Sequence, residues 1–215
     1  MRFGGKCESD GSERKGTTGA ILLAGGRSRR MGRDKAGLPV GGRTLLERTI
    51  ALLNPLVVHT VVMLAENRDI SYLPKDMLRS VTVGRDKRAE QGPLQGIGDG
   101  VVLLERAITE VFVLSCDLPY LNSVWLGKMR DRLRQGADIV CSVNGTIANP
   151  LIAIYKRSVL ERAGQLIGQG YRRPLELWRG FRVEHLVPTE EERRLVTDIN
   201  TLQEYQAAVE YFADG

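Results

Sequence analysis

Cationic side chains and glycines are concentrated in one short stretch of this chain. Residues 23–35 read LAGGRSRRMGRDK, with three glycines, four arginines and a terminal Lys35. The apolar run 20–23 leads into this stretch and predicts a short buried strand. Glycines let the backbone turn tightly and approach a ligand, so that N–H groups and cations can bind its phosphates. The stretch therefore predicts a loop for a nucleoside triphosphate, with a solvated Arg-rich turn as the alternative.

A single carboxylate, Asp117, stands where a metal ion could be held. It follows the apolar run 111–115, and Pro119 stiffens the turn after it. A carboxylate at the end of a strand points out of the sheet, where Mg²⁺ can bridge it to phosphate oxygens. The alternative is an aspartate that bonds its own backbone in a turn. Asp117 is thus a candidate metal ligand.

Two more polar residues come after expected strands, Asn67 and Asp86. A buried carboxylate can accept hydrogen bonds from both N1–H and N2–H of guanine, a pair of donors that cytosine and uracil lack. Asp86 is therefore a candidate for reading the base, and Asn67 for the base or the ribose. Each could equally be an ordinary polar loop residue.

Histidine and cysteine usage does not favour zinc or nucleophilic catalysis. The chain has only two histidines, and its three cysteines show no C-x-x-C spacing. Cys116 and Cys141 lie in or beside apolar runs, where cysteine packs as a small core residue. This usage is typical of a reducing compartment, so we expect a cytoplasmic protein.

Strand and helix patterns alternate along the chain. Strands are expected at residues 18–23, 57–64, 80–83, 111–115, 137–143 and 151–155, and helices near 45–53, 92–106, 122–135, 159–167, 174–178 and 201–212. Alternation predicts an α/β fold: a single Rossmann-like domain, residues 18–215, with a mostly parallel central sheet flanked by helices. Ligands of such sheets bind beyond the carboxyl ends of the strands, where the loop after residue 23 and Asp117 both lie. Residues 1–17 are rich in glycine and charge and are expected to form a flexible tail.

The net charge of +5 raises the question of a polyanionic partner. Only 6% of the residues are aromatic and none is interleaved with the basic clusters, so we expect an anionic small molecule and no nucleic acid. No apolar run approaches the ~20 residues of a membrane span, and no membrane contact is expected.

Residues 23–35 resemble the signature LAGGxSxRMGxDK of the molybdenum-cofactor guanylyltransferases, a family of the nucleotidyltransferase superfamily. Residues 116–119 resemble the CDxP motif, in which the aspartate holds magnesium. The resemblance implies that Lys35, Arg30 and Asp117 are catalytic and that Asp117 binds the metal. It implies a nucleotide site made by Leu23, Ala24, Gly25, Gly26, Lys35, Asn67, Asp86 and Asp117.

Three weaker segments agree in order and spacing. Residues 92–97 resemble the GPLxGI segment that borders the nucleotide, and residues 198–201 resemble the start of a DIN-T-P-E segment but depart from it at Leu202. By this resemblance Asn200 helps the first carboxylate with the metal or the acceptor. Residues 149–151 resemble a family segment that usually reads His- or Arg-Pro-Leu near the acceptor, which implies that Asn149 lies there. Arg172 could meet the phosphate of the acceptor.

The resemblance implies Mg²⁺-dependent transfer of GMP from GTP to the terminal phosphate of molybdopterin carrying molybdenum. Pyrophosphate leaves, and the guanine dinucleotide cofactor formed could be handed to molybdoenzymes or their chaperones. Three alternatives stay open: a cytidylyltransferase, whose loop usually carries alanine at the position of Gly26, a sugar-phosphate nucleotidyltransferase, and a non-catalytic nucleotide-binding regulator.

Overall fold

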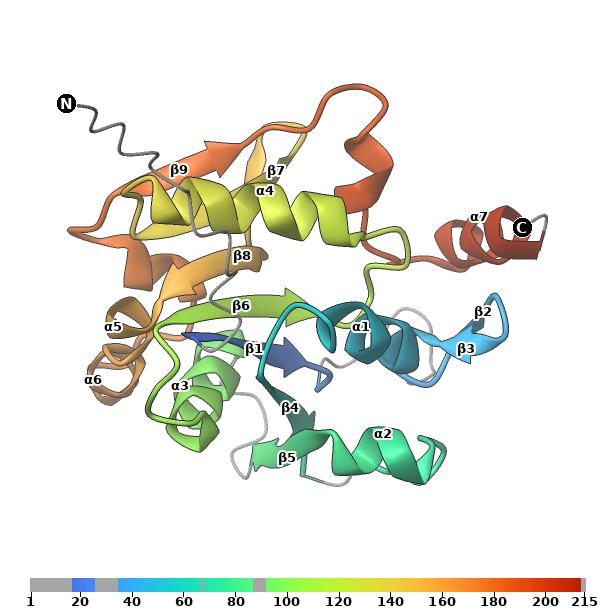
Figure 1. Cartoon of the computed structure of the whole chain (residues 1–215), viewed down its shortest axis with the longest axis horizontal. Helices are drawn as coiled ribbons and strands as arrows, with labels where there is room; N and C mark the ends of the chain where they lie inside the picture. The colour runs from blue at the N-terminus through green and yellow to red at the C-terminus, as the bar shows by residue number, and fades with distance from the viewer. Residues whose placement is uncertain (1–16, 26–34, 67, 87–91, 214–215) are drawn as a thin grey trace, which may run out of the picture.

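The computed structural model describes residues 17–25, 35–66, 68–86 and 92–213. Seven strands form one sheet in the order β5-β4-β1-β6-β8-β7-β9 (Figure 1). Their bounds are β1 Thr18–Leu23, β4 His59–Ala65, β5 Val81–Asp86, β6 Glu110–Ser115, β7 Ile139–Asn144, β8 Ile147–Lys156 and β9 Val183–Leu186.

Four neighbouring strands, β5, β4, β1 and β6, run parallel. Strand β8 is antiparallel to both β6 and β7, and β9 is parallel to β7. In the parallel half, Leu23 at the end of β1 is in register with Met63 of β4 and Ser115 of β6. The carboxyl ends of these strands therefore lie level, and the expected mostly parallel α/β sheet is confirmed.

Helices cover both faces of the sheet. Helices α1 (Leu45–Leu53) and α4 (Ser123–Arg134) pack in one apolar cluster with alternate strand residues such as Leu22. Helices α3 (Pro93–Leu103), α5 (Arg157–Leu160) and α6 (Ala163–Gly168) form the second cluster, which contains Ile21. Since Leu22 and Ile21 are adjacent and both fully buried, β1 is the centre of a three-layer molecule.

A third, smaller cluster lies beyond the carboxyl ends of the strands. The hairpin of β2 (Pro39–Val40) and β3 (Arg43–Thr44) packs here against α7 (Leu202–Ala213), as Figure 1 shows. Gly41 and Gly42, with φ of 58° and 74°, make the two-residue turn that such a tight hairpin needs.

Several elements differ from the sequence expectation. The hairpin, α2 (Lys75–Arg79), β9 and the 3-10 turn Arg193–Val196 were not expected, because segments of two to five residues are too short to show a period. The strand expected to end at residue 83 continues through Gly84 to Asp86, and the helix expected to reach residue 106 ends at Leu103. The helix expected at 159–167 is two short helices, α5 and α6.

The helices are short. The longest in the part of the chain that the structure describes, α4 and α7, have 12 residues each. None of the described helices combines the length and the apolar character needed to cross a lipid bilayer.

Candidate functional site

Two segments with predicted site residues leave the sheet at the same point: the chain after β1, which leads into residues 26–35, and residues 116–119, called here the CDLP turn. The N–H of Cys116 donates to the carbonyl of Leu23 at 3.2 Å, and the N–H of Ala24 donates to the carbonyl of Met63 at 2.9 Å. The backbone after β1 is thus held between the ends of β6 and β4, where the sequence places ligand binding.

Gly25 passes very close to β4. A Cβ built on Gly25 would lie 2.9 Å from the backbone nitrogen of Ala65, so a larger residue would force the two chains apart. Gly26 and Arg30, both predicted site residues, lie outside the described residues. Lys35 is the first described residue after this gap.

Lys35, Asp117 and Asn200 meet although they are far apart in the sequence. The ammonium of Lys35 donates to Oδ2 of Asp117 at 3.1 Å and to Oδ1 of Asn200 at 2.8 Å. The side chains of Lys35 and Asp117 are each 17% exposed, so the ion pair is shielded but open to a ligand. The structure therefore brings three of the predicted site residues into one constellation.

Asn200 is held in place from several directions. Its Nδ2 donates to Oδ2 of Asp198 at 2.8 Å, and its backbone N–H donates to Oε2 of Glu204 at 2.7 Å. Glu204 and Thr201 form the expected capping box at the start of α7. Burial would raise the pKa of Glu204, but the N–H donors outweigh it and lower that pKa. The N–H of Ile199 donates to the carbonyl of Asp117 at 3.0 Å, which joins this segment to the CDLP turn.

Asp117 has the features of a ligand for a hard cation. Its Oδ1 is buried and has no hydrogen-bond partner among the described residues, so one carboxylate oxygen is left for a ligand. No group of three His, Cys, Asp or Glu residues in the described part of the chain could hold a metal by itself. Mg²⁺ is typically bound by one or two carboxylates together with substrate phosphates. The residues present therefore fit a magnesium ion that arrives with a triphosphate.

Helix α3 begins near the carboxyl end of β1. Gly92 has φ of 78° and Pro93 occupies the first turn of the helix. Added Cβ atoms on Gly96 and Gly100 would lie 3.0 Å from Leu23 and 2.8 Å from Ile21, so these glycines let α3 lie tightly on β1. The positive end of the α3 dipole is thereby placed near the end of β1.

Arg172 has a local role. Its Nη1 donates to the carbonyls of Ile167 and Tyr171, and its own carbonyl accepts from the N–H of Leu94 at 3.4 Å. The carbonyl of Arg172 also lies 2.9 Å from where a Cβ of Gly92 would stand. The residue supports the start of α3, and its proposed contact with the acceptor phosphate stays a prediction.

Asp86 ends β5, opposite Ala65 and two strands away from β1. Asn67 lies outside the described residues. The sequence analysis did not single out Arg85. Its Nη1 donates to the carbonyls of Glu66 at 3.0 Å and Arg68 at 2.8 Å. Arg85 ties β5 to both sides of position 67, and nothing in the sequence pattern distinguishes it from other surface arginines.

Asn149 lies in β8 opposite Ser142, where the β7–β8 register shifts. Its Oδ1 accepts from the N–H of Leu151 at 2.9 Å, so the carbonyl end of the side chain stabilises this irregularity in the strand. Its predicted contact with the acceptor is not tested by this arrangement.

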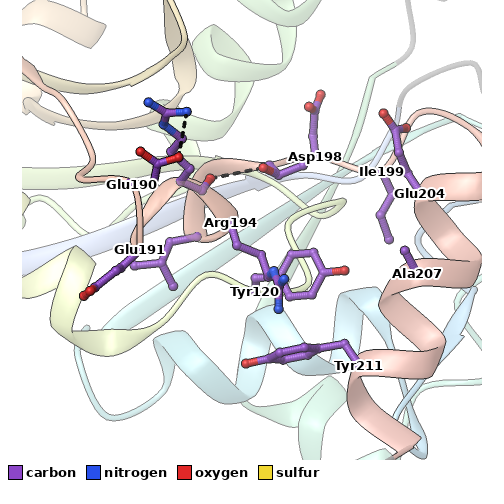
Figure 2. Close-up of a pocket in the computed structure, with 12 residues that line it drawn as sticks. Tyr120, Glu190, Glu191, Arg194, Asp198, Ile199, Glu204, Ala207 and Tyr211 are labelled. Atoms are coloured by element: carbon purple, nitrogen blue, oxygen red, sulfur yellow. Dashed lines mark hydrogen bonds and ion pairs between the residues drawn. The ribbon is translucent and has the colours of Figure 1, made fainter.

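A pocket of about 660 Å³ borders the constellation on the side of α7 (Figure 2). Asp198 and Glu204 line its upper part, and Tyr120, Arg194 and Tyr211 lie below them. The guanidinium of Arg194 lies 4.8 Å from the centre of the Tyr211 ring and 5.6 Å from that of Tyr120. Tyr120 directly follows the CDLP turn, but no sequence pattern pointed to this pocket.

Comparison with known proteins agrees with this geometry. The profile of the MobA-like NTP transferase domain matches residues 20–185. A relative from Mycobacterium tuberculosis, named probable molybdenum cofactor guanylyltransferase, is 34% identical over 157 residues, which cover 71% of this chain and 75% of the relative. A protein of the same name from Opitutus terrae is also 34% identical, over 70% of this chain and 72% of the relative.

Solved structures show the same fold. Molybdopterin-guanine dinucleotide biosynthesis protein A from Archaeoglobus fulgidus superposes with a TM-score of 0.71 and 22% identity, covering 92% of this chain and 100% of that one. A 4-diphosphocytidyl-2C-methyl-D-erythritol synthase from Anaerococcus prevotii gives a TM-score of 0.70 at 12% identity, covering 93% and 99%. The motifs at residues 23–35 and 116–119, the profile match and the 34%-identical relatives lead to one conclusion: this chain is a nucleotidyltransferase and belongs to the MobA-like family.

Proposed function

We propose that the protein transfers GMP from GTP to the terminal phosphate of molybdopterin carrying molybdenum, with Mg²⁺, and releases pyrophosphate. The observation that carries the proposal is the meeting of Lys35, Asp117 and Asn200 at the carboxyl ends of β1 and β6. The names of the 34%-identical relatives support the choice of acceptor and nucleotide.

The chemistry needs positioning and charge neutralisation more than a nucleophilic side chain. The acceptor phosphate is already anionic, attacks the α-phosphate of GTP in line, and expels pyrophosphate. Lys35 is paired with Asp117 and would turn its ammonium toward the triphosphate when the nucleotide binds. Asp117 would hold magnesium through Oδ1, which has no hydrogen-bond partner among the described residues, and the ion would supply positive charge for the phosphates.

Base selection is proposed to come from the edge of the sheet. Asp86, at the end of β5, presents a carboxylate that can accept the two donors of guanine. Adenine has an amino group but no N1–H, and would leave one oxygen of this half-buried carboxylate without a donor beneath the bound base, which costs about 1–3 kcal/mol. We therefore expect GTP to be preferred over ATP and CTP by at least about tenfold in kcat/KM.

We further propose that the reaction takes place in the cytoplasm. Cys141 is buried and forms no disulfide with any residue that the structure describes, as expected of a thiol in a reducing compartment. Burial also raises the pKa of Cys141 to about 12, which keeps that thiol unreactive. The product would be handed on to molybdoenzymes or their chaperones.

The test is pyrophosphate release from each of the four NTPs with Mg²⁺, with and without molybdopterin. The expected result is release that needs both GTP and molybdopterin, and a product that contains GMP by mass spectrometry. An Asp86→Asn variant should lose preference among bases while keeping its dependence on molybdopterin. Equal or better use of CTP would overturn the guanylyl assignment and favour a cytidylyltransferase.

A further inference from the structure

The C-terminal helix α7 contacts both segments that supply partners to Asp117. Helix α7 lies beyond residue 185, where the family profile ends, so the profile match assigns it no role. Its first residues follow Asn200 directly, and its later residues pack on the hairpin that follows Lys35. The helix thus connects two segments that are 165 residues apart and whose side chains meet at one point.

The first connection is between α7 and the hairpin. The hydroxyl of Tyr205 donates to the carbonyl of Pro39 at 2.8 Å. Phe212 packs closely on the hairpin turn: a Cβ built on Gly41 would lie 2.9 Å from the Cβ of Phe212. The guanidinium of Arg48 lies 3.8 Å from the centre of the Phe212 ring and donates to the carbonyl of Val40 at 3.3 Å.

The second connection is between the hairpin and Lys35. The N–H of Leu38 donates to the carbonyl of Lys35 at 3.0 Å, and the N–H of Leu46 donates to the carbonyl of Ala36 at 3.1 Å. Leu38 is 6% exposed and packs in the same small cluster as Val40, Leu45 and Ala208. The backbone of Lys35 is therefore fixed to the hairpin, and through Leu38 to α7.

The third connection is between α7 and Asn200. Glu204, in the first turn of α7, accepts the N–H groups of Asn200 and Thr201, both at 2.7 Å. Ile199, which precedes Asn200, is buried in the cluster that contains Ala208 of α7. Figure 2 shows Ile199 and Glu204 side by side at the start of this helix.

We propose that α7 is a brace that sets the position of Lys35 relative to Asn200, and that Tyr205 is its positioning residue. Tyr205 touches no substrate in this proposal and acts through the Lys35–Asn200 pair. The inference rests on the proposed function only in requiring nucleotidyl transfer at Asp117; it does not depend on the base. Since small displacements of a positioned phosphate-binding group are costly in rate, the hydroxyl of Tyr205 contributes to turnover.

The experiment is Tyr205→Phe, which removes one oxygen atom and keeps the ring. Glu210→Gln is the control, because Glu210 is exposed on the same helix and does not line the pocket beside the site. We expect kcat/KM for the nucleotide to fall about tenfold in Tyr205→Phe and to stay within about twofold in Glu210→Gln. Melting temperatures of both variants should stay within about 4 °C of the wild type, which excludes unfolding as the cause.

A double-mutant cycle separates positioning from general stabilisation. In an Asn200→Ala background the pair that the brace aligns is gone, so Tyr205→Phe should change kcat/KM by less than about twofold. A tenfold loss in both backgrounds, or no loss in the wild-type background, would overturn the proposal. The cycle is run with the NTP that the wild type uses best, so a wrong base assignment leaves it intact. Absence of any transfer by the wild type would instead count against the proposed function.

Discussion

The two oxygens of the Asp117 carboxylate have different surroundings. Oδ2 accepts from the ammonium of Lys35, while Oδ1 is buried with no donor among the described residues. An acceptor that is buried without any donor costs about 1–3 kcal/mol, so Oδ1 would gain from a cation or a donor brought by a ligand. This is the reason for assigning a functional role to that oxygen.

Asp117→Ala should abolish turnover and leave the fold intact. Losing the carboxylate that orients the metal should cost several kcal/mol of transition-state stabilisation, or at least about a hundredfold in kcat. Pyrophosphate release and circular dichroism, measured on the same sample, test this. Asp138→Asn is the control, because Asp138 pairs with Lys156 and has no contact with Asp117. Near-normal turnover of Asp117→Ala would show that Asp117 is only a turn residue.

At the scale of elements, one carboxylate joins β1, β6 and α4. Glu110 in β6 accepts two hydrogen bonds from the guanidinium of Arg134, both at 2.8 Å, and a third from the hydroxyl of Thr18 at 2.8 Å. Burial would raise the pKa of Glu110, but these donors outweigh it and hold the pKa below the ordinary 4.5. The folded state therefore favours the ionised form.

Glu110 should make stability depend on pH in the acid range. Because its folded pKa is lowered, its contribution is complete above pH 4.5 and is lost as the pH falls through 4.5 and below. Glu110→Gln should cost about 1–2 kcal/mol at pH 7 and progressively less as the pH falls below 4.5. Urea denaturation at a series of pH values tests this, with Glu161→Gln, at an exposed pair, as the control. A difference from the wild type that does not vary with pH would contradict the prediction.

Elements with a clear period were predictable, and those stabilised by tertiary contact were not. The helix Leu45–Leu53 and the strand Thr18–Leu23 have the expected bounds, because apolar spacing and the run of buried residues define them. The β2–β3 hairpin and β9 form through packing and pairing that no local pattern encodes. The same holds for the site, where motifs pointed to Lys35, Asp117 and Asn200. Tyr205 donates one hydrogen bond and Arg85 donates two to backbone carbonyls, and no sequence pattern distinguishes such donors from other polar surface residues.

At the scale of the whole molecule, residues 1–16 should be dispensable. They are rich in glycine and charge and offer little apolar area to bury. A chain that begins at Thr17 keeps the carbonyl that accepts the N–H of Thr109 at 2.9 Å. We expect its melting temperature to fall by less than about 4 °C and its activity to be unchanged.

The control is a chain that begins at Gly19, which also loses the hydroxyl of Thr18 beside Glu110 and should melt at a lower temperature. Thermal denaturation and pyrophosphate release of both truncated chains are the measurements. A large loss in the chain that begins at Thr17 would mean that the first 16 residues pack on the domain.

The strand order has a consequence for how the molecule opens. Strand β1 is covered by β4 and β6 on its two sides, whereas β5 is an edge strand whose residues are mostly half-exposed. Amide hydrogens of β1 and β6 should exchange with solvent only through global unfolding of the domain, whereas those of β5 should exchange through local unfolding. The groups proposed to bind the phosphates follow the strands expected to exchange most slowly, whereas Asp86, which is proposed to bind the base, ends the faster edge strand. Fraying of β5 alone would then release the base of a bound nucleotide while the protein still binds its triphosphate.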